Sequence, residues 1–213
     1  MKISDKYALV AQVLKTLYPD THTFLHYSKD YEFLFAIILS AQATDDSVNQ
    51  ATSRLFKEFP SLNDYKVENK DRIYSIIKNV GLGKSKSEYL IKTADILLKE
   101  YQGRVPKNRE ELMKLYGVGY KTSGVLLAEL YDFPYIPVDT HILRVSHRIG
   151  LVKDDLDATA TEKALEKGFK DFHKIEIHRQ LILFGRNICK ALKPSCMDCP
   201  YKEICKYHIK NGR

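Results

Sequence analysis

Four cysteines within the last 25 residues are the strongest chemical signal in the sequence. They follow the pattern C-x6-C-x2-C-x5-C and no others occur: Cys189, Cys196, Cys199 and Cys205. This clustering indicates a four-thiolate metal site, because disulfides are rare in a reducing cytosol. Structural zinc usually binds two close C-x2-4-C pairs, whereas only one such pair occurs here. An iron-sulfur cubane can be bound by four cysteines of a single loop. The spacing therefore favours an iron-sulfur cluster over zinc, and disulfides come third.

A second candidate site is the segment Gly117-Val118-Gly119, which predicts a tight turn between two helices. Asn108 and Glu111 are spaced as the N-cap of the first helix and its N3 partner. Two glycines around one residue let successive backbone N–H groups point outward at the start of the second helix, where they favour a phosphate oxygen. A plain turn between helices is the simpler interpretation of G-V-G alone.

Lys121 lies in the first turn of the helix expected after this turn. Most lysines are solvated surface residues, and that interpretation stays open here. The positive end of a helix dipole and burial in a cleft both disfavour the ammonium form, so an amine placed here is more easily neutral. A neutral amine attacks carbon, and the position therefore predicts a nucleophile.

Asp139 directly follows YDFPYIPV, whose Pro134 and Pro137 mark the best domain boundary. An apolar stripe comes next, formed by Ile142, Leu143, Val145 and Ile149. Because aspartate is a preferred N-cap residue, its simplest role is to begin this helix. That role does not exclude catalysis.

The elements that must position these residues are predicted to be helices. Apolar side chains recur every three or four positions between cap signals, most clearly in residues 9–17, 48–59, 73–80 and 90–101. The first helix should follow Ser4 and the second Asp45 or Asp46, and the last two should close at Gly81 and Gly103. The run FLFAIILSAQ is apolar on all sides and predicts a central helix, because no strand candidate can pair with it. The predicted fold class is all-α.

The composition is that of a folded, basic protein. With 213 residues, 44% of them hydrophobic, the chain can form one large domain or two small ones. The net charge of +7 favours a polyanionic partner, and residues 180–213 hold seven Lys and Arg against two acidic residues. Residues 33–39, the longest apolar run, are far fewer than the ~20 of a membrane span. The N-terminus lacks signal-peptide features, so a cytoplasmic location is expected.

Four strings in matching order resemble the endonuclease III family of helix-hairpin-helix DNA glycosylases: LSAQATD, LYGVGYKTSGVLL, VDTH and the cysteine pattern. The resemblance spans nearly the whole chain. It implies a bifunctional base-excision repair enzyme that removes oxidised pyrimidines and cleaves the abasic site by β-elimination. Lys121 is the implied Schiff-base nucleophile, and Asp139 is implied to stabilise the cationic sugar and assist proton transfer. The four cysteines are implied to bind a [4Fe-4S] cluster that shapes a DNA-binding loop.

The resemblance also implies how DNA is held. A stacked base is inaccessible, so the nucleotide must be rotated outward and side chains must fill its place. Gln42 and Leu82 are the implied wedges, although Gln42 could simply end the buried helix and Leu82 could pack beneath Gly81. Other implied DNA contacts are Gly117, Val118, Gly119, His141, Lys190 and Lys193. Tyr116 stands where the hairpin usually has proline, and Gly83 where a larger residue is common.

The implied architecture is a six-helix domain, residues 22–133, and a cluster-bearing domain made from residues 1–21 and 134–213. Double-stranded DNA containing damaged pyrimidines or abasic sites is expected in the cleft between them. We expect a monomer with no membrane partner, associated with the nucleoid of a bacterium.

Two other functions stay open. A monofunctional mismatch glycosylase on the same fold is disfavoured by Lys121, which such relatives typically lack. A non-enzymatic DNA-binding module with structural zinc would use only the hairpin and the basic C-terminal segment. Iron and sulfide in the purified protein exclude that module, whereas stoichiometric zinc would support it.

Overall fold

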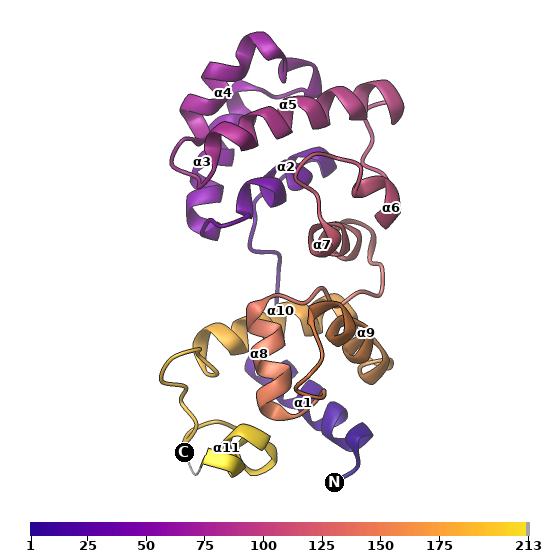
Figure 1. Ribbon diagram of the computed structural model, residues 1–213, viewed down its shortest axis with the longest axis vertical. Helices are drawn as coiled ribbons and strands as arrows, with labels where there is room; N and C mark the ends of the chain where they lie inside the picture. Colours follow the sequence, from indigo (N-terminus) through magenta and orange to yellow (C-terminus); the bar gives the residue numbers. More distant parts are fainter. Residues whose placement is uncertain (212–213) are drawn as a thin grey trace. The chain divides into compact units, whose positions relative to one another are not determined.

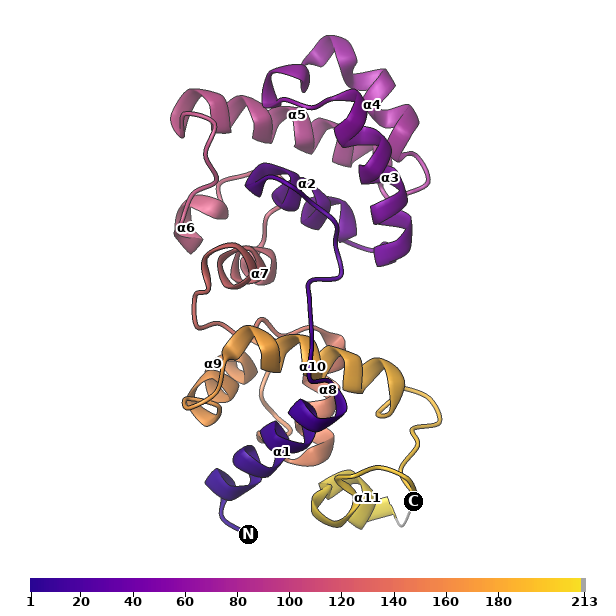
Figure 2. The ribbon, with the colours of Figure 1, turned by 180° about the vertical axis from the view of Figure 1, so that it is seen from behind.

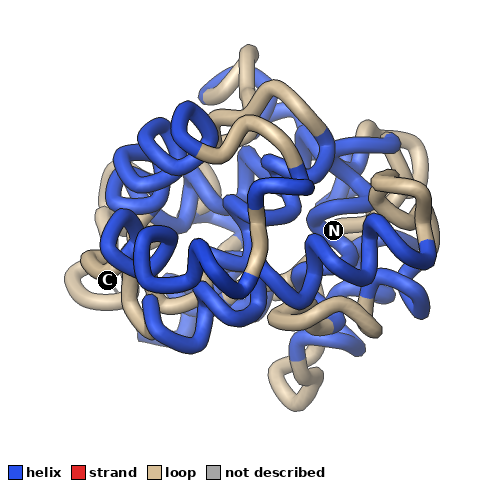
Figure 3. Tube along the Cα trace, turned by 90° about the horizontal axis from the view of Figure 1, so that it is seen from above, coloured by secondary structure: helices blue, strands red, loops and turns tan. Residues whose placement is uncertain are grey.

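The computed structural model describes residues 1–211, and every regular element in that range is a helix (Figure 3). The all-α prediction is confirmed. The chain divides into two compact units: unit 1 comprises Met1–His22 with Asp132–Arg213, and unit 2 comprises Thr23–Tyr131. None of the helices in the described range combines the length and apolar character that a membrane span requires.

Unit 2 is built around the apolar run, which forms α2 (Asp30–Ser40). All its residues from Tyr31 to Leu39 are buried, as expected of a helix that is apolar on all sides. Three helices of this unit pack on it (Figure 1): α3 (Asp45–Glu58), α5 (Gly83–Glu100) and α7 (Tyr120–Tyr131). The remaining elements of the unit are η1 (Leu62–Asp64), η2 (Val67–Asn69), α4 (Lys70–Ile77) and α6 (Arg109–Leu112).

Unit 1 joins the N-terminal helix to the C-terminal part of the chain. The helix α10 (Lys174–Asn187) packs against both α1 (Ile3–Leu17) and α8 (Thr140–Ile149), as Figure 2 shows. A Cβ atom on Gly185 of α10 would lie 2.9 Å from the Cβ of His141, so glycine allows α8 and α10 to approach closely. The other elements are α9 (Ala158–Gly168), η3 (Lys202–Ile204) and α11 (Lys206–Asn211).

Several predicted helix limits were wrong. The first helix begins at Ile3, so Ser4 lies inside its first turn. Thr44 caps α3, because its hydroxyl accepts a hydrogen bond from the Ser47 N–H at 3.3 Å. Asp45 and Asp46 follow in the first turn, where their negative charges interact favourably with the positive end of the helix dipole. Three leucines at the edges of the predicted apolar stripes are exposed: Leu9, Leu17 and Leu98. The neighbouring elements cover a narrower part of each helix surface than the apolar residues occupy.

The two glycines predicted to close helices have different roles. Gly103 has φ 76 and donates its N–H to the Leu97 carbonyl at 2.8 Å, so it ends α5 as predicted. The prediction for Gly81 was wrong, because α4 already ends at Ile77. A Cβ on Gly81 would lie 2.9 Å from the carbonyl oxygen of Gln42. Gly81 is therefore needed where two backbone segments meet.

Candidate active site and metal centre

Two loops of unit 2 hold the predicted wedge residues. The Gln42 loop (residues 41–44) joins α2 to α3, and the Leu82 loop (residues 78–82) joins α4 to α5. Gln42 has φ 57 and Leu82 has φ 62, a left-handed conformation that costs roughly 1–2 kcal/mol for an L residue. Surrounding contacts must impose such strain, which tends to occur at functional sites.

Both wedge side chains are exposed on unit 2. Leu82 is 60% exposed, so the alternative that it packs beneath Gly81 is wrong. Gln42 is exposed as well, and α2 ends before it, at Ser40. Neither side chain therefore has a structural role that accounts for its strained backbone.

Sequence reasoning missed Lys86, which connects these loops. Its side chain is only 2% exposed, and Nζ donates hydrogen bonds to the carbonyls of Leu39 (2.8 Å) and Ala41 (2.6 Å). Its backbone N–H donates to the Leu82 carbonyl at 3.0 Å. Burial lowers the pKa of Lys86. The signal that could have found it is its spacing, because Lys86 continues the buried stripe of Leu90, Ala94 and Leu97.

The glycine hairpin lies between α6 and α7. Asn108 caps α6 as predicted, its Oδ1 accepting the Glu111 N–H at 2.8 Å, although α6 is only four residues long. Gly117 has φ 79, and a Cβ there would lie 3.0 Å from side-chain atoms of both Ile38 and Tyr89. Glycine is therefore required for conformation and for space.

One part of the predicted phosphate site was wrong. The N–H of Val118 does not point outward, because it donates to the Leu115 carbonyl at 3.2 Å within the turn. The Val118 side chain is buried and anchors the hairpin. Within residues 1–211 the N–H groups of Gly117 and Gly119 have no backbone acceptor, and the space around Gly119 is open. These two amides are the hairpin's available donors.

Tyr116, which replaces the usual proline, ties the hairpin to α5. Its ring stacks on Tyr89 with centroids 6.3 Å apart, and Lys92 Nζ lies 4.8 Å from its centroid. The Thr93 hydroxyl donates to the Tyr116 carbonyl at 3.3 Å. Three contacts with one helix thus constrain the residue before Gly117.

The two predicted catalytic side chains belong to different units. Lys121 is exposed in the first turn of α7 and forms no hydrogen bond or ion pair with any described residue. Asp139 is the N-cap of α8, as predicted, and its Oδ1 accepts the Ile142 N–H at 2.8 Å. Within the described chain its second oxygen, Oδ2, forms no hydrogen bond. His141 lies 3.2 Å, ring Nδ1 to Nη2, from Arg144.

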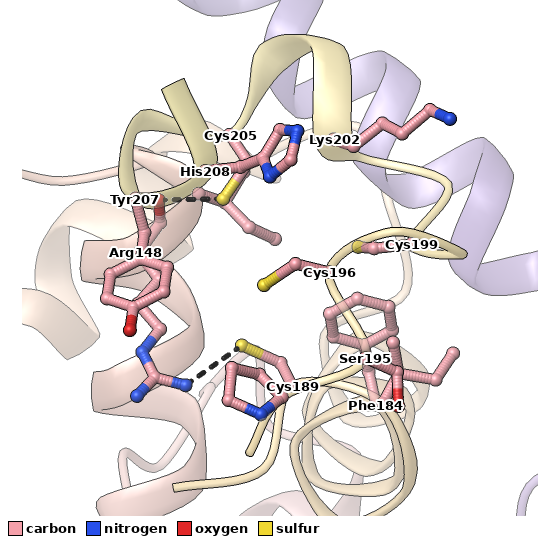
Figure 4. A pocket seen from close by; sticks show the side chains of 13 residues that line it. Arg148, Phe184, Cys189, Ser195, Cys196, Cys199, Lys202, Cys205, Tyr207 and His208 are labelled. Carbon is pink, nitrogen blue, oxygen red and sulfur yellow. Dashed lines mark hydrogen bonds between the residues drawn. The ribbon is translucent and has the colours of Figure 1, made fainter. Parts of the chain in front are cut away.

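The four cysteines are brought together around one pocket of unit 1, and none forms a disulfide (Figure 4). They lie on the cysteine loop (residues 188–205) between α10 and α11. Phe184 and Ile149 form part of the apolar wall. Burial raises the pKa of the Cys199 thiol to about 11 and also raises that of Cys189. Without a cation these thiols stay protonated, whereas a bound metal would stabilise the thiolates.

The spacing of the sulfurs bears on which metal group fits. In tetrahedral zinc sites, Zn–S bonds of 2.3 Å put neighbouring sulfurs about 3.8 Å apart. Among residues 1–211, no three Cys, His, Asp or Glu side chains converge closely enough to hold a single ion. The shared pocket and the single-loop spacing C-x6-C-x2-C-x5-C are compatible with an iron-sulfur cubane.

Two arginines on α8 hold the start of the cysteine loop, and sequence reasoning missed both. Arg144 donates to the carbonyls of Cys189 (3.0 Å) and Gly185 (2.9 Å). Arg148 donates to the carbonyls of Lys190 (2.7 Å) and Ala191 (3.0 Å). Their spacing of four residues, which puts them on one helix face after VDTH, was the available signal.

The predicted basic residues of the cysteine loop are exposed. Lys190 and Lys193 are both exposed, and Lys193 has a left-handed backbone with φ 50. Because Arg148 binds the Lys190 carbonyl, α8 links this basic loop to Asp139 at its own N-terminus.

Comparison with known proteins places these sites in a family context. Residues 35–171 match the model of the HhH-GPD superfamily base excision DNA repair proteins. The chain is 44% identical to the endonuclease III of Rickettsia prowazekii over 191 residues, 90% of each chain. It is 40% identical to that of Escherichia coli over 192 residues, again 90% of each. Its fold matches an endonuclease III trapped as a covalent DNA intermediate, with TM-score 0.92, 36% identity and complete coverage of both chains.

Proposed function

The chain belongs to the endonuclease III family of HhH-GPD base excision DNA repair proteins, and we propose how its residues divide the reaction. It is a DNA glycosylase that is also an abasic-site lyase. The DNA it acts on is, in this proposal, a duplex with an oxidised pyrimidine. The observation that carries the assignment is an exposed lysine without a partner, two residues beyond the glycine hairpin.

Lys121 is the nucleophile in this proposal. Its amine bonds to the sugar C1′ as the bond from C1′ to the base breaks, and the base leaves with a proton. The sugar ring opens to a Schiff base, from which loss of a C2′ proton expels the 3′ phosphate by β-elimination. Water then hydrolyses the Schiff base and restores the amine. An exposed lysine without an ion pair can enter this cycle without first losing a carboxylate partner.

Asp139 supplies the complementary charge. One carboxylate oxygen is fixed by the Ile142 N–H, so the group has a set orientation. The second oxygen is left to stabilise the positive charge that develops on the sugar and to assist proton transfer. Capping and catalysis therefore use different atoms of the same side chain.

DNA contacts come from both units. In unit 2, Gln42 and Leu82 fill the space of the rotated nucleotide, and the amides of Gly117 and Gly119 bind phosphate. In unit 1, His141 with Lys190 and Lys193 add contacts to the DNA. Because several of these groups neutralise phosphates, binding should weaken steeply as salt concentration rises.

The four cysteines hold a [4Fe-4S] cluster in this proposal. Support comes from the cysteine spacing, from the shared pocket, and from the arginines that fix the loop's first backbone carbonyls. The cluster's chemistry is that of a thiolate-bound cation that stabilises a loop. No catalytic step needs it, because Lys121 and Asp139 supply the nucleophile and the charge. We further propose that the protein acts as a monomer in the cytoplasm.

Borohydride trapping tests the central assignment. A duplex with one thymine glycol is incubated with wild type, Lys121→Ala and the control Lys114→Ala, which removes a nearby exposed lysine. Wild type and the control should form a reduced covalent adduct, and Lys121→Ala should form at least about 100-fold less. Persistent adduct in Lys121→Ala would assign the nucleophile to another amine. Base release without any adduct in wild type would make the enzyme monofunctional.

A further inference from the structure

We propose that Lys86 is a positioning residue that sets both wedge loops before DNA binds. The inference rests on the proposed wedge roles of Gln42 and Leu82. It assigns to one buried side chain the task of holding the Gln42 loop in place against the Leu82 loop.

The first observation is where the Lys86 ammonium group lies. Carbonyls at the end of a helix lack intrahelical partners and carry the negative end of its dipole, and α2 has no basic residue of its own in its last turn. Lys86 reaches them from α5, which packs against α2 (Figure 1). Two charge-assisted bonds, to Leu39 and Ala41, thus cap α2 from another helix.

The second observation is that this buried cation has no carboxylate partner. Within residues 1–211, no acidic side chain forms an ion pair with Lys86. A buried ammonium without a carboxylate partner needs other groups to accept its hydrogen bonds, and the carbonyls of Leu39 and Ala41 do so. An apolar side chain of similar length would leave both carbonyls without this donor, so the placement of the two carbonyls explains a lysine here.

The third observation is that three constraints meet at the same point. The Lys86 side chain binds the Ala41 carbonyl, directly before Gln42, and Lys86 itself is fixed to the Leu82 loop by the first helical bond of α5, from its backbone N–H to the Leu82 carbonyl. Gly81 leaves the Gln42 carbonyl just enough room to sit beside it. Both wedge residues are strained, so the Gln42 loop would relax relative to the Leu82 loop if the Lys86 side-chain contacts were lost. Because the loops are already fixed when the protein folds, DNA binding does not carry the entropic cost of ordering them.

This role predicts a difference between two DNA substrates. A lesion in a duplex must be rotated out of the stack, and the wedges are needed for that step. An abasic sugar in a single strand is already accessible, so Lys121 should react with it without help from the wedges. A defect in wedge position should therefore slow the duplex reaction and spare the single-strand reaction.

The test uses Lys86→Met, which keeps the length of the side chain and removes its donors. Its control is Lys84→Met, which removes an exposed positive charge from the same helix. Single-turnover thymine glycol excision from a duplex is measured beside borohydride trapping on a single-stranded abasic oligonucleotide. Lys86→Met should lose roughly 10- to 100-fold on the duplex and less than about twofold on the single strand. Lys84→Met should keep the wild-type ratio of the two rates.

Each other outcome has a defined meaning. Equal loss on both substrates, or no loss on either, overturns the role of Lys86. If Lys86→Met does not fold, Lys86→Gln, which keeps a shorter donor, should show a smaller duplex-specific loss, and an unchanged ratio would overturn the role. Failure of wild type itself to form any adduct would instead refute the proposed function, because that reaction does not depend on Lys86.

Discussion

The wedge loops, which are the Gln42 and Leu82 loops of unit 2, and the cysteine loop of unit 1 obtain their shapes from different sources. The wedge loops are held by polypeptide alone, through Lys86 and the close approach at Gly81. The cysteine loop is held by arginine contacts at its start, near Cys189 and Lys190. Its four thiols line one pocket, and burial raises the pKa of the Cys189 and Cys199 thiols, so a bound cation would stabilise these two as thiolates.

This difference shows where each loop's ordering free energy arises. In unit 2 the free energy that orders the loops comes from folding of the polypeptide. Part of this free energy is used to hold Gln42 and Leu82 in the strained left-handed conformation. In unit 1 the proposed metal centre would couple it to binding of the cofactor. The cysteine loop should therefore respond to loss of the cofactor, whereas the wedge loops should respond only to mutations in their own contacts.

The largest effect is expected from Cys199→Ser, which replaces one proposed cluster ligand. The variant should lose most of its iron and sulfide, and unit 1 should be destabilised by about 3 kcal/mol or more. Amide hydrogen exchange should speed up in residues 188–205 and stay unchanged in residues 39–44 and 80–86. Met197→Ser changes an exposed residue of the same loop and should keep its iron. Faster exchange in the wedge loops of Cys199→Ser would show that their order also depends on the metal centre of unit 1.

An intermediate effect is expected from Leu82→Asn, which tests the stored strain. Asparagine adopts the left-handed conformation more readily than leucine, so the free energy of unfolding in urea should rise by up to about 1 kcal/mol. Excision from a duplex should fall roughly 10-fold, because the apolar wedge is lost.

The matched control for strain is Leu192→Asn in the cysteine loop. Leu192 is 85% exposed and is not among the residues with positive φ, so its change should stay within about 0.5 kcal/mol. A Leu82→Asn variant less stable than wild type would show that the left-handed backbone is not strained.

The same two regions show what a sequence can predict. The helical core, the cap at Asn108 and the N-cap at Asp139 were predictable, because helix periodicity and capping depend on residues within one or two turns. The cysteine spacing likewise predicted that four thiols meet, since short loops hold them together.

Contacts between distant segments could not be predicted in this way. Lys86 was visible as a residue on a buried helix face, but the carbonyls it binds lie 45 and 47 positions away. Gly81 was assigned to a helix end because a glycine needed for close approach and one needed for a cap look the same in sequence. The partners of Arg144 and Arg148, more than 40 residues away, were equally hidden.

The smallest effect is expected from Tyr116→Ala, at the position where this chain departs from the usual hairpin proline. The stack on Tyr89 and the Lys92 ammonium compensate for the missing ring constraint, so their loss should cost about 0.5–1 kcal/mol of stability. Affinity for abasic duplex should fall about threefold, because Gly117 and Gly119 lose part of their fixed orientation.

Tyr74→Ala is the matched control for this change. Tyr74 is 41% exposed against 42% for Tyr116, but no ring or cation stacks on it among the described residues. Its removal should change neither stability nor affinity measurably. Equal effects of the two variants in urea unfolding would show that the contacts of Tyr116 do not stabilise the hairpin. A loss confined to Tyr116→Ala would instead mean that α5 positions the hairpin through Tyr116 as it positions the wedge loops through Lys86, with polypeptide contacts alone.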